Sequence, residues 1–549
     1  MIDEKTAELL VERLIRRIEQ ANTYFLMKIG ASVGKIRELT PSQAQQLVQI
    51  LKYGGNYDKI VKEIAKYTNM NIKDIDDIFS TYAKKDQLFY EKFYKYKGKK
   101  FVPFDENKAL KRQTQALANI VKNEMYDFTR SNVLGYTIRD LKGNPQFIGL
   151  KETYNRVLDE ALLNVGQGKE TFDSAMTRIL KDIGGSGLKT LEYESGRSVR
   201  LDSAVRMHLK SKLRELHNEN QRIFGQEFGA DGIEISVHEN PAPDHEKVQG
   251  RQFSYKEYEK LQNGEEAKDY KGNTYTLDHD GKNGYRPISE LNCYHYEFDI
   301  ILGVSKPEYT DKQLKQIIDN NEKGFEFEGK HYTNYEGTQL QRMLERKIRE
   351  QKDTQILAKA SGNEFLVGES QNKIRIFTNK YKELSDASGL PTKAKRMKVS
   401  AYRRSASATK TYNDTINKMK VGEFDITKYT NEIKPTTKDV ILTPKQDYHI
   451  KKDHQEVMPY YDKLSDIINN PDNVYMELGK NKNTIWVTKE IDGHNIKATI
   501  RINTSTLYQN KTAGYKNSVI QMQPLPKDRI EKRIKKGEIK ELFDLSNKK

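Results

Sequence analysis

The stretch that decides the fold of the C-terminal part begins Ile491-Asp492-Gly493-His494-Asn495 and continues to Ile502. From 496 to 502 every second residue is apolar, which is the two-residue period of a half-buried β-strand. The Asp-Gly pair before this run is typical of a tight hairpin turn. We therefore predict strands at 484–488 and 496–502 with a turn just before the second.

Further elements follow on both sides of this hairpin. Residues 474–478 and 518–522 have strand-like composition, and 456–469 has helical spacing that ends at Asn470-Pro471. These segments predict an α+β domain with an antiparallel sheet over residues 436–549.

The first 230 residues instead show the spacing of helices. Thr40-Pro41-Ser42 has the composition of a helix start, with proline just inside the cap. Two apolar stripes have helical spacing. One is at i, i+4, i+5 and i+8 (Leu10, Leu14, Ile15 and Ile18), and the other has steps of four, four and three residues (Val205, Leu209, Leu213 and Leu216). We predict a structural helical bundle over residues 1–230.

Three segments connect these two parts. Residues 231–310 are rich in Gly, Pro, Asn and aromatic residues, and they include a strand candidate at 233–237. Helical spacing resumes at 311–390, where we expect a long, exposed connecting helix, and 391–435 reads as a basic linker. The predicted fold class is multidomain, with a mainly α-helical N-terminal region, a small loop-rich α+β middle segment and an α+β C-terminal domain.

Charge is distributed unevenly along the 549 residues. The whole chain has 94 Lys and Arg against 78 Asp and Glu, a formal charge of +16. Residues 391–549 contain 32 of these cations and 19 of the acids, whereas residues 1–390 are nearly balanced. This excess predicts an anionic partner for the C-terminal part, with nucleic acid as the default and a merely solvated basic surface as the alternative.

Other features exclude some protein classes. Cys293 is the only cysteine, so no intrachain disulfide can form, as expected for a protein made in a reducing cytoplasm. The N-terminus has acidic residues and no apolar run, and no 18 apolar residues occur together. We expect neither a signal peptide nor a membrane anchor.

Four side chains of the middle segment are candidate metal ligands. Imidazole and thiolate suit zinc, and four such groups could form a closed tetrahedral structural site, the candidates being His238, His245, Cys293 and His295. Rival ligands are Asp244, Asp278, His279 and Asp280. Alternatively, the four side chains make ordinary hydrogen bonds that hold irregular loops.

The same region contains several unusual motifs, which are Tyr193-Glu194-Ser195-Gly196-Arg197, Leu201 to Met207, Ser236 to His245, Gln249 to Ser254, and Leu291 to Tyr296 with Gly303 and Pro307. Together they resemble the minor capsid protein 2 group of tailed phages, which is related to the Mu F-like head-morphogenesis proteins. The resemblance implies a virion protein made in the host cytoplasm that contacts portal and major capsid proteins in head assembly or DNA packaging and delivery. One departure is Tyr294, where the family tends to have a basic residue.

The order of elements after residue 436 resembles phage-borne nuclease domains of the barnase, EndoU, colicin and RelE toxin group. The resemblance supports His449 and His454 as site residues and, less directly, Asn517 and Ser518. It implies an RNase or other nuclease acting on nucleic acid, and an immunity protein would be a further partner of such a toxin domain.

Metal-free RNA cleavage needs a base for the 2′-hydroxyl, an acid for the leaving oxygen and cations for the phosphate charge. Histidine serves either proton role near neutral pH. We assign His449 as the leading acid or base and His454 as its partner or orienting group. Phosphate contacts are assigned from charge and position to Arg501, Lys511 or Lys451, with Ser518 as a hydrogen-bond donor.

Two other functions stay open at this point, and so does whether the chain is an enzyme. The protein could be purely structural, with a basic C-terminal domain that binds DNA without catalysis. It could instead carry an ADP-ribosyltransferase domain, although the only related motif is Glu538-x-x-Glu541, whose spacing looks like a helical charge face. A histidine at a helix start is also often only a cap.

Overall fold

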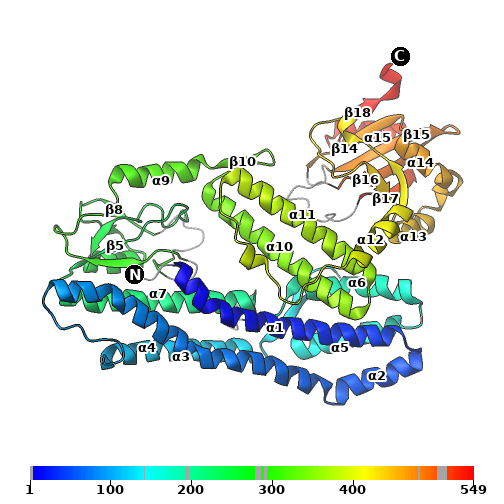
Figure 1. The fold of residues 1–549 in the computed structure, drawn as a ribbon. Coiled ribbons are helices and arrows are strands. Elements are labelled where there is room, and N and C mark those ends of the chain that lie inside the picture. Colours follow the sequence, from blue (N-terminus) through cyan, green and yellow to red (C-terminus); the bar gives the residue numbers. More distant parts are fainter. Residues whose placement is uncertain are drawn as a thin grey trace. The chain divides into compact units, whose positions relative to one another are not determined.

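The structure of the chain is a computed structural model that describes residues 4–130, 132–140, 142–191, 197–277, 286–289, 293–479, 483–503 and 516–548. It forms two compact units (Figure 1). The helical unit comprises Met1–Gly362 and Tyr381–Tyr402, and the sheet unit comprises Asn363–Lys380 and Arg403–Lys549. Within the described residues, no helix combines the length and the apolar character needed to cross a membrane.

Long helices dominate the helical unit, as the sequence predicted. Thr40 caps α2 in a capping box with Gln43, which confirms the predicted helix start. The apolar stripes lie in α1 and α7, where Leu14 and Leu209 are fully buried between packed helices. The helices are α1 (Glu4–Arg37), α2 (Pro41–Tyr53), α3 (Asn56–Tyr96), α4 (Lys108–Thr129), α5 (Leu150–Asn164), α6 (Lys169–Ser186), α7 (Leu201–Glu227), α8 (Tyr255–Gln262), α9 (Asp311–Lys323) and α10 (Asn334–Ser361).

Small antiparallel sheets are attached to these helices. One has the strand order β2-β1-β3-β4 and another the order β6-β5-β9, while β7 pairs with β8 and β10 with β11. The predicted strand at 233–237 corresponds to β5 at Gly232–Ile235. The other strands are β1 (Leu134–Arg139), β2 (Pro145–Gly149), β3 (Lys189–Leu191), β4 (Ser198–Arg200), β6 (Gln252–Ser254), β7 (Ala267–Lys268), β8 (Thr274–Tyr275), β9 (Glu297–Ile300), β10 (Phe325–Phe327) and β11 (Lys330–Tyr332).

The helix expected to be exposed and connecting is instead α10, which packs against α1 and α6. Its charged residues led to the wrong expectation, because some of them form buried ion pairs inside the fold. Asp353 of α10 is buried and lies 3.3 Å from the Arg200 guanidinium, which also binds Asp202 at 3.1 Å. Burial alone would raise the pKa of Asp202, but the guanidinium groups of Arg200 and Arg349 hold it well below its usual range.

A seven-stranded sheet forms the sheet unit, in the order β12-β13-β17-β16-β15-β14-β18. All pairings are antiparallel except β13 with β17, which confirms the predicted sheet type. The strands are β12 (Lys420–Glu423), β13 (Asp439–Ile441), β14 (Asn473–Glu477), β15 (Thr484–Ile491), β16 (His494–Arg501), β17 (Asn517–Pro524) and β18 (Ile539–Asp544). The remaining helices are α11 (Glu364–Ser388), α12 (Ala406–Lys418), α13 (Pro444–Asp453), α14 (Leu464–Asn469) and α15 (Lys527–Lys535).

The predicted hairpin is present as β15 and β16. Its two turn residues, Asp492 and Gly493, have φ of 51° and 77°, which an Asp-Gly turn tolerates. The alternation puts Ile496, Ala498 and Ile500 into the main core of the unit.

Two segments differ from expectation in their local structure. The helix expected at 456–469 is split into a 3₁₀ helix at Gln455–Lys463 and α14, because Pro459 cannot donate a backbone hydrogen bond. The basic linker expected at 391–435 contains α12 and also β12, which pairs with β13. Short 3₁₀ helices lie at Ala394–Met397, Ile426–Lys428 and Leu545–Lys548. The division of the chain into the five predicted functional segments stays a prediction.

Candidate functional site

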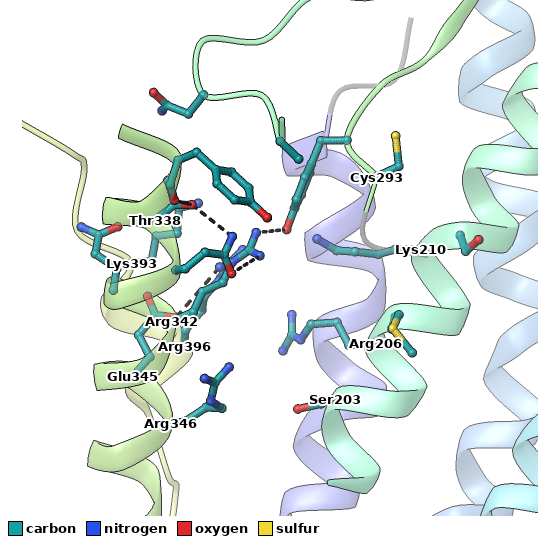
Figure 2. A pocket seen from close by; sticks show the side chains of 18 of the residues that line it. Ser203, Arg206, Lys210, Cys293, Thr338, Arg342, Glu345, Arg346, Lys393 and Arg396 are labelled. Atoms are coloured by element: carbon teal, nitrogen blue, oxygen red, sulfur yellow. Dashed lines mark hydrogen bonds and ion pairs between the residues drawn. The ribbon is translucent and has the colours of Figure 1, made fainter. Parts of the chain in front are cut away.

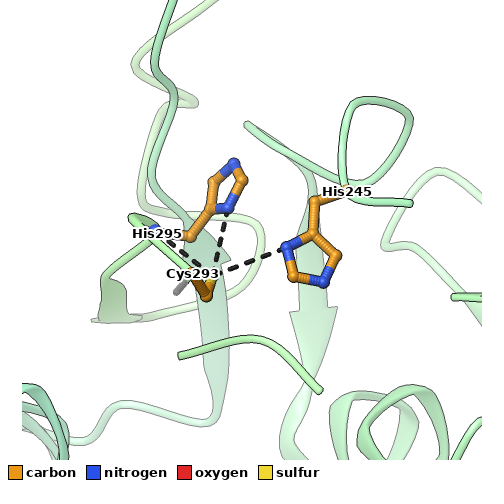
Figure 3. Close-up of side chains that lie close together, drawn as sticks. All are labelled: His245, Cys293 and His295. Carbon is orange, nitrogen blue, oxygen red and sulfur yellow. Dashed lines mark hydrogen bonds between the residues drawn. The ribbon is translucent and has the colours of Figure 1, made fainter. Parts of the chain in front are cut away.

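The antiparallel pairing of β5 with β9 brings together two loops of the middle segment. Ile235 at the end of β5 lies opposite Glu297 at the start of β9, and Ser236 N–H donates to the Tyr296 carbonyl at 2.9 Å. His245 follows β5 in sequence, whereas Cys293 and His295 come just before β9. The three side chains meet although His245 precedes Cys293 by 48 residues (Figure 3).

The polar atoms of this His-Cys cluster, defined as His245, Cys293 and His295, lie within 4.8 Å of one another. The Cys293 Sγ atom is 3.5 Å from His245 Nδ1 and 3.4 Å from His295 Nδ1. All three residues are buried, with relative exposures of 0% for His245, 2% for Cys293 and 1% for His295. Burial lowers the pKa of both histidines, so their imidazoles are neutral near pH 7.

The far nitrogen of each imidazole has its own partner. His245 Nε2 lies 2.7 Å from the carbonyl oxygen of Arg286, and His295 Nε2 lies 3.3 Å from Gln249 Oε1. Because both partners can only accept, each Nε2 must carry the proton and donate it. Each Nδ1 is then unprotonated and faces the cysteine sulfur, which is the tautomer that a metal ligand needs.

The remaining predicted ligands are arranged differently. The His238 ring lies 4.3 Å from the His295 ring, but His238 is outside the three-residue set, and burial lowers its pKa to about 4. Asp244 binds Arg286 through two contacts of 3.0 and 2.9 Å. Asp278, His279 and Asp280 lie outside the described residues.

The two C-terminal histidines come together at the end of α13. His449 lies in this helix, which Thr443 caps, and His454 is the residue that follows it. Their ring centroids are 5.3 Å apart in an edge-to-face arrangement. His449 Nδ1 lies 2.7 Å from the carboxylate of Asp453, and His454 Nδ1 lies 3.1 Å from that of Glu456.

The histidine pair is accessible from solvent to different degrees. The His449 side chain is 41% exposed and that of His454 is 16% exposed. His454 Nε2 also lies 3.4 Å from the side-chain nitrogen of Gln521 in β17. The pair therefore sits beside the sheet, with each Nδ1 oriented by a carboxylate.

The other predicted residues of this domain occupy separate positions. Arg501 and Ser518 lie opposite each other in β16 and β17. Asn517 is fully buried and both ends of its amide are used, at 2.8 Å to Asn503 N and 2.7 Å to the Thr437 carbonyl. Lys451 binds Asp447 at 2.9 Å.

Lys511 lies outside the described residues.

Comparison with known proteins gives one match. The model of the family described as phage minor capsid protein 2 matches residues 2–386. The chain belongs to the phage minor capsid protein 2 family. It is a structural protein of the phage virion and interacts with other head proteins. Neither the search of curated proteins nor the search of solved structures found a match.

One of the two candidate sites lies within the residues that match the minor capsid family, and the other lies outside them. The matched residues include the His-Cys cluster and all motifs quoted for the resemblance. The predicted membership of the minor capsid protein 2 family is therefore confirmed. The match ends before the basic segment and the whole α+β domain. The nuclease resemblance of that domain stays a prediction.

Sequence reasoning missed several residues that complete these sites. Asp453 and Glu456 orient the two histidines, and Gln249 and Arg286 do so for the His-Cys cluster. Of these, only Asp453 had a readable signal, because it follows His449 by four residues within a helix. The others depend on loop conformations that have no periodic pattern.

Proposed function

We propose that this minor capsid protein acts close to the portal vertex, in head assembly or in DNA packaging and delivery, through contacts with portal and major capsid proteins. We further propose that its C-terminal domain is a metal-independent ribonuclease and that its middle segment holds a structural zinc ion. Family membership supports the first part. The second part rests mainly on the carboxylate-oriented pair of His449 and His454.

The geometry of the histidine pair supports acid-base chemistry. RNA cleavage needs one group that accepts a proton and one that donates it, and two imidazoles with ring centroids 5.3 Å apart are close enough to serve one phosphodiester. A carboxylate at Nδ1 directs the proton there and leaves Nε2 for substrate, as in other acid-base histidines. Gln521 beside His454 offers an amide that can contact a phosphate oxygen or orient the ring.

Arg501 and Ser518 are proposed to bind phosphate, since they face each other across adjacent strands. Lys451 is two residues from His449 in α13, a spacing that puts the two side chains on different faces of the helix, and it binds Asp447, so we do not place it at the phosphate. We leave Asn517 out of the reacting group because its amide is buried and fully used within the fold. Its side-chain amide donates to the Thr437 carbonyl and so stabilises the contact of β17 with the segment before β13.

The proposed zinc site is supported by the spacing of its ligand atoms. Tetrahedral zinc with Zn–S of about 2.3 Å and Zn–N of about 2.0 Å puts sulfur and nitrogen ligands about 3.5 Å apart. The observed separations from sulfur to the two Nδ1 atoms are 3.5 and 3.4 Å. A thiol has one proton and can satisfy only one of the two unprotonated nitrogens, whereas a metal ion would satisfy all three atoms.

Zinc bound here would connect the two loops that follow β5 and precede β9, and so stabilise the middle segment. His245, Cys293 and His295 would hold it, with Gln249 and the Arg286 carbonyl orienting the imidazoles. His238 is the candidate for the fourth position, because it lies against His295.

The nuclease proposal is tested with the purified full-length protein and labelled RNA and DNA, with and without chelator. We expect RNA cleavage that survives EDTA and falls by roughly 10²- to 10⁴-fold in His449→Ala and in His454→Ala. His331→Ala, in the helical unit, is the matched control and should cleave normally. Cleavage by both variants at the parental rate would overturn the catalytic assignment.

Absence of product from either nucleic acid would refute the ribonuclease. In that case a DNA-binding role for the domain would show as retention of DNA that weakens steeply as salt rises. This outcome would leave the capsid role unaffected.

The zinc proposal is tested by metal analysis of the same preparation. We expect one zinc per chain, lost in Cys293→Ser and retained in His331→Ala. A preparation without stoichiometric zinc would dismiss the site. Since the expected RNA cleavage needs no metal, the two proposals can fail independently.

A further inference from the structure

A large cavity of about 890 Å³ lies within the helical unit, between α7, α10 and the segment that includes residues 393–396. Figure 2 shows Arg342 and Arg346 on α10 on one side and Arg206 and Lys210 on α7 on the other, with Lys393 and Arg396 beside α10. The His-Cys cluster borders the same cavity. The proposed zinc ligands lie at this cavity, but the proposed function assigns no ligand to the cavity itself.

The lining of the cavity is strongly cationic. Among the described residues that line it, eleven are Lys or Arg and four are Asp or Glu. The cations are Arg197, Arg206, Lys210, Arg214, Arg286, Arg342, Arg346, Arg349, Lys393, Lys395 and Arg396, and the acids are Glu19, Asp202, Glu239 and Glu345. Such clustering in a concave site produces a positive potential that attracts anions.

Part of this charge is neutralised inside the protein. Arg206 and Lys210 both bind Glu8 of α1, and Arg349 binds Asp202. Arg396 lies 3.9 Å from Glu345, at the limit of an ion pair. These contacts hold the walls of the cavity in place.

Three cations are not neutralised in this way. Within the described part of the chain, no carboxylate lies within 4.0 Å of the charged groups of Arg342, Arg346 or Lys393. Arg342 instead donates to the hydroxyl of Tyr294 at 2.9 Å. Partial burial, together with repulsion from Arg396 and Arg342, lowers the pKa of Lys393.

We propose that this cavity binds a compact polyphosphate, meaning a chain of three or more phosphoryl groups as in a nucleoside triphosphate or inorganic polyphosphate. Guanidinium groups match phosphate oxygens through paired N–H donors, and here they converge from two helices. Several cations can then each contact one of the successive phosphoryl groups. A ligand with a single carboxylate could not pair with all of these cations.

The size of the cavity favours a small ligand over double-stranded nucleic acid. A volume of about 890 Å³ is at the upper end of small-molecule sites. It corresponds to a cube roughly 10 Å on a side. A duplex, whose major groove alone is about 12 Å wide, does not fit into such a space. Tyr294 and Tyr335 also line the space and provide aromatic surface for a nucleobase.

The test uses the full-length protein and sodium tripolyphosphate at 150 mM salt, with calorimetry and thermal unfolding as the two readouts. We expect saturable binding and a rise in Tm, because the ligand relieves repulsion among the lining cations. Replacing both Arg342 and Arg346 by Gln should raise Kd roughly ten- to a hundredfold. The single variant Arg346→Gln, at an exposed position, guards against misfolding of the double variant and should also weaken binding.

The control removes the same charge elsewhere. Lys312 and Lys315 are exposed on α9, and their replacement by Gln should leave Kd unchanged. If the Arg342/Arg346 and the Lys312/Lys315 double variants change Kd equally, the effect is one of non-specific charge and the proposal is overturned. A Kd for tripolyphosphate weaker than about 1 mM, which corresponds to only about 4 kcal/mol of binding free energy, would also overturn the proposal.

Two further ligands identify the source of the phosphates. ATP that binds as tightly as tripolyphosphate indicates recognition of the phosphate chain alone, whereas tighter binding of ATP indicates that the base is recognised as well. Binding of a single-stranded oligonucleotide without binding of tripolyphosphate would refute the compact ligand. The proposal does not depend on the ribonuclease or on the zinc site.

Discussion

Replacement of Glu19 by Gln should stabilise the helical unit above neutral pH. Glu19 lies in α1, and burial, followed by repulsion from Asp202 and Asp353, raises its pKa from 4.5 to about 7. The guanidinium group of Arg349 acts in the opposite direction without cancelling these effects. The folded protein therefore holds a proton on this carboxyl that the unfolded chain releases at lower pH.

The size of the effect follows from the difference in pKa. As pH rises from about 4.5 to about 7, the unfolded chain ionises freely while the folded protein resists ionisation, so the free energy of unfolding falls by about 3 kcal/mol. Above about pH 7 the loss is complete and constant. Gln is neutral throughout, so the variant escapes this loss. For a unit of roughly 380 residues, 3 kcal/mol corresponds to about 4 °C in Tm.

The assay is thermal unfolding followed by circular dichroism at pH 5 and pH 8. We expect Glu19→Gln to match the parent closely at pH 5 and to unfold about 4 °C higher at pH 8. Glu106→Gln, at an exposed position before α4, is the control and should show no such difference. An advantage of Glu19→Gln that is equal at both pH values would show that the carboxyl does not titrate as argued.

Three other changes test the fold and the site. Gly135→Ala would put a Cβ atom 2.1 Å from a backbone oxygen of β2, and it should cost about 1–3 kcal/mol in chemical denaturation; unchanged stability would contradict this close packing of β1 on β2. Asp353→Asn leaves the buried Arg200 guanidinium with one anionic partner fewer and should cost about 3–5 kcal/mol in the same assay. Asp453→Asn should slow RNA cleavage about tenfold and shift its pH profile, because the carboxylate orients His449; an unchanged profile would contradict that role.

Much of the secondary structure could be predicted because it depends on short-range patterns. The stripe from Val205 to Leu216 needed only the spacing of one helix, and the hairpin at Asp492-Gly493 only the preferences of two turn residues. The position of α10 could not be predicted in this way. Its charged residues look solvent-exposed in sequence, and the ion pairs Arg200–Asp353 and Asp202–Arg349 show how two of them enter the interior.

The sequence could predict which residue types form the candidate sites, but it could not predict which individual residues come together there. The sequence suggested four metal ligands with several rivals, whereas three atoms converge and Asp244 is paired with Arg286. Convergence depends on the register of β5 with β9, which periodicity does not encode. The two C-terminal histidines could be paired because they are five residues apart around one helix end.

The sequence by itself determined the helical N-terminal region, the antiparallel C-terminal sheet and the family of the protein, since local spacing and short motifs are enough for these. It also showed residues 1–390 as nearly neutral. Only the tertiary structure revealed the cationic cavity, where eight Lys and Arg side chains of that nearly neutral part come together with Lys393, Lys395 and Arg396 of the basic segment. Net charge is a sum over the whole chain, but electrostatic potential depends on distance, so a balanced segment can still contain an anion site.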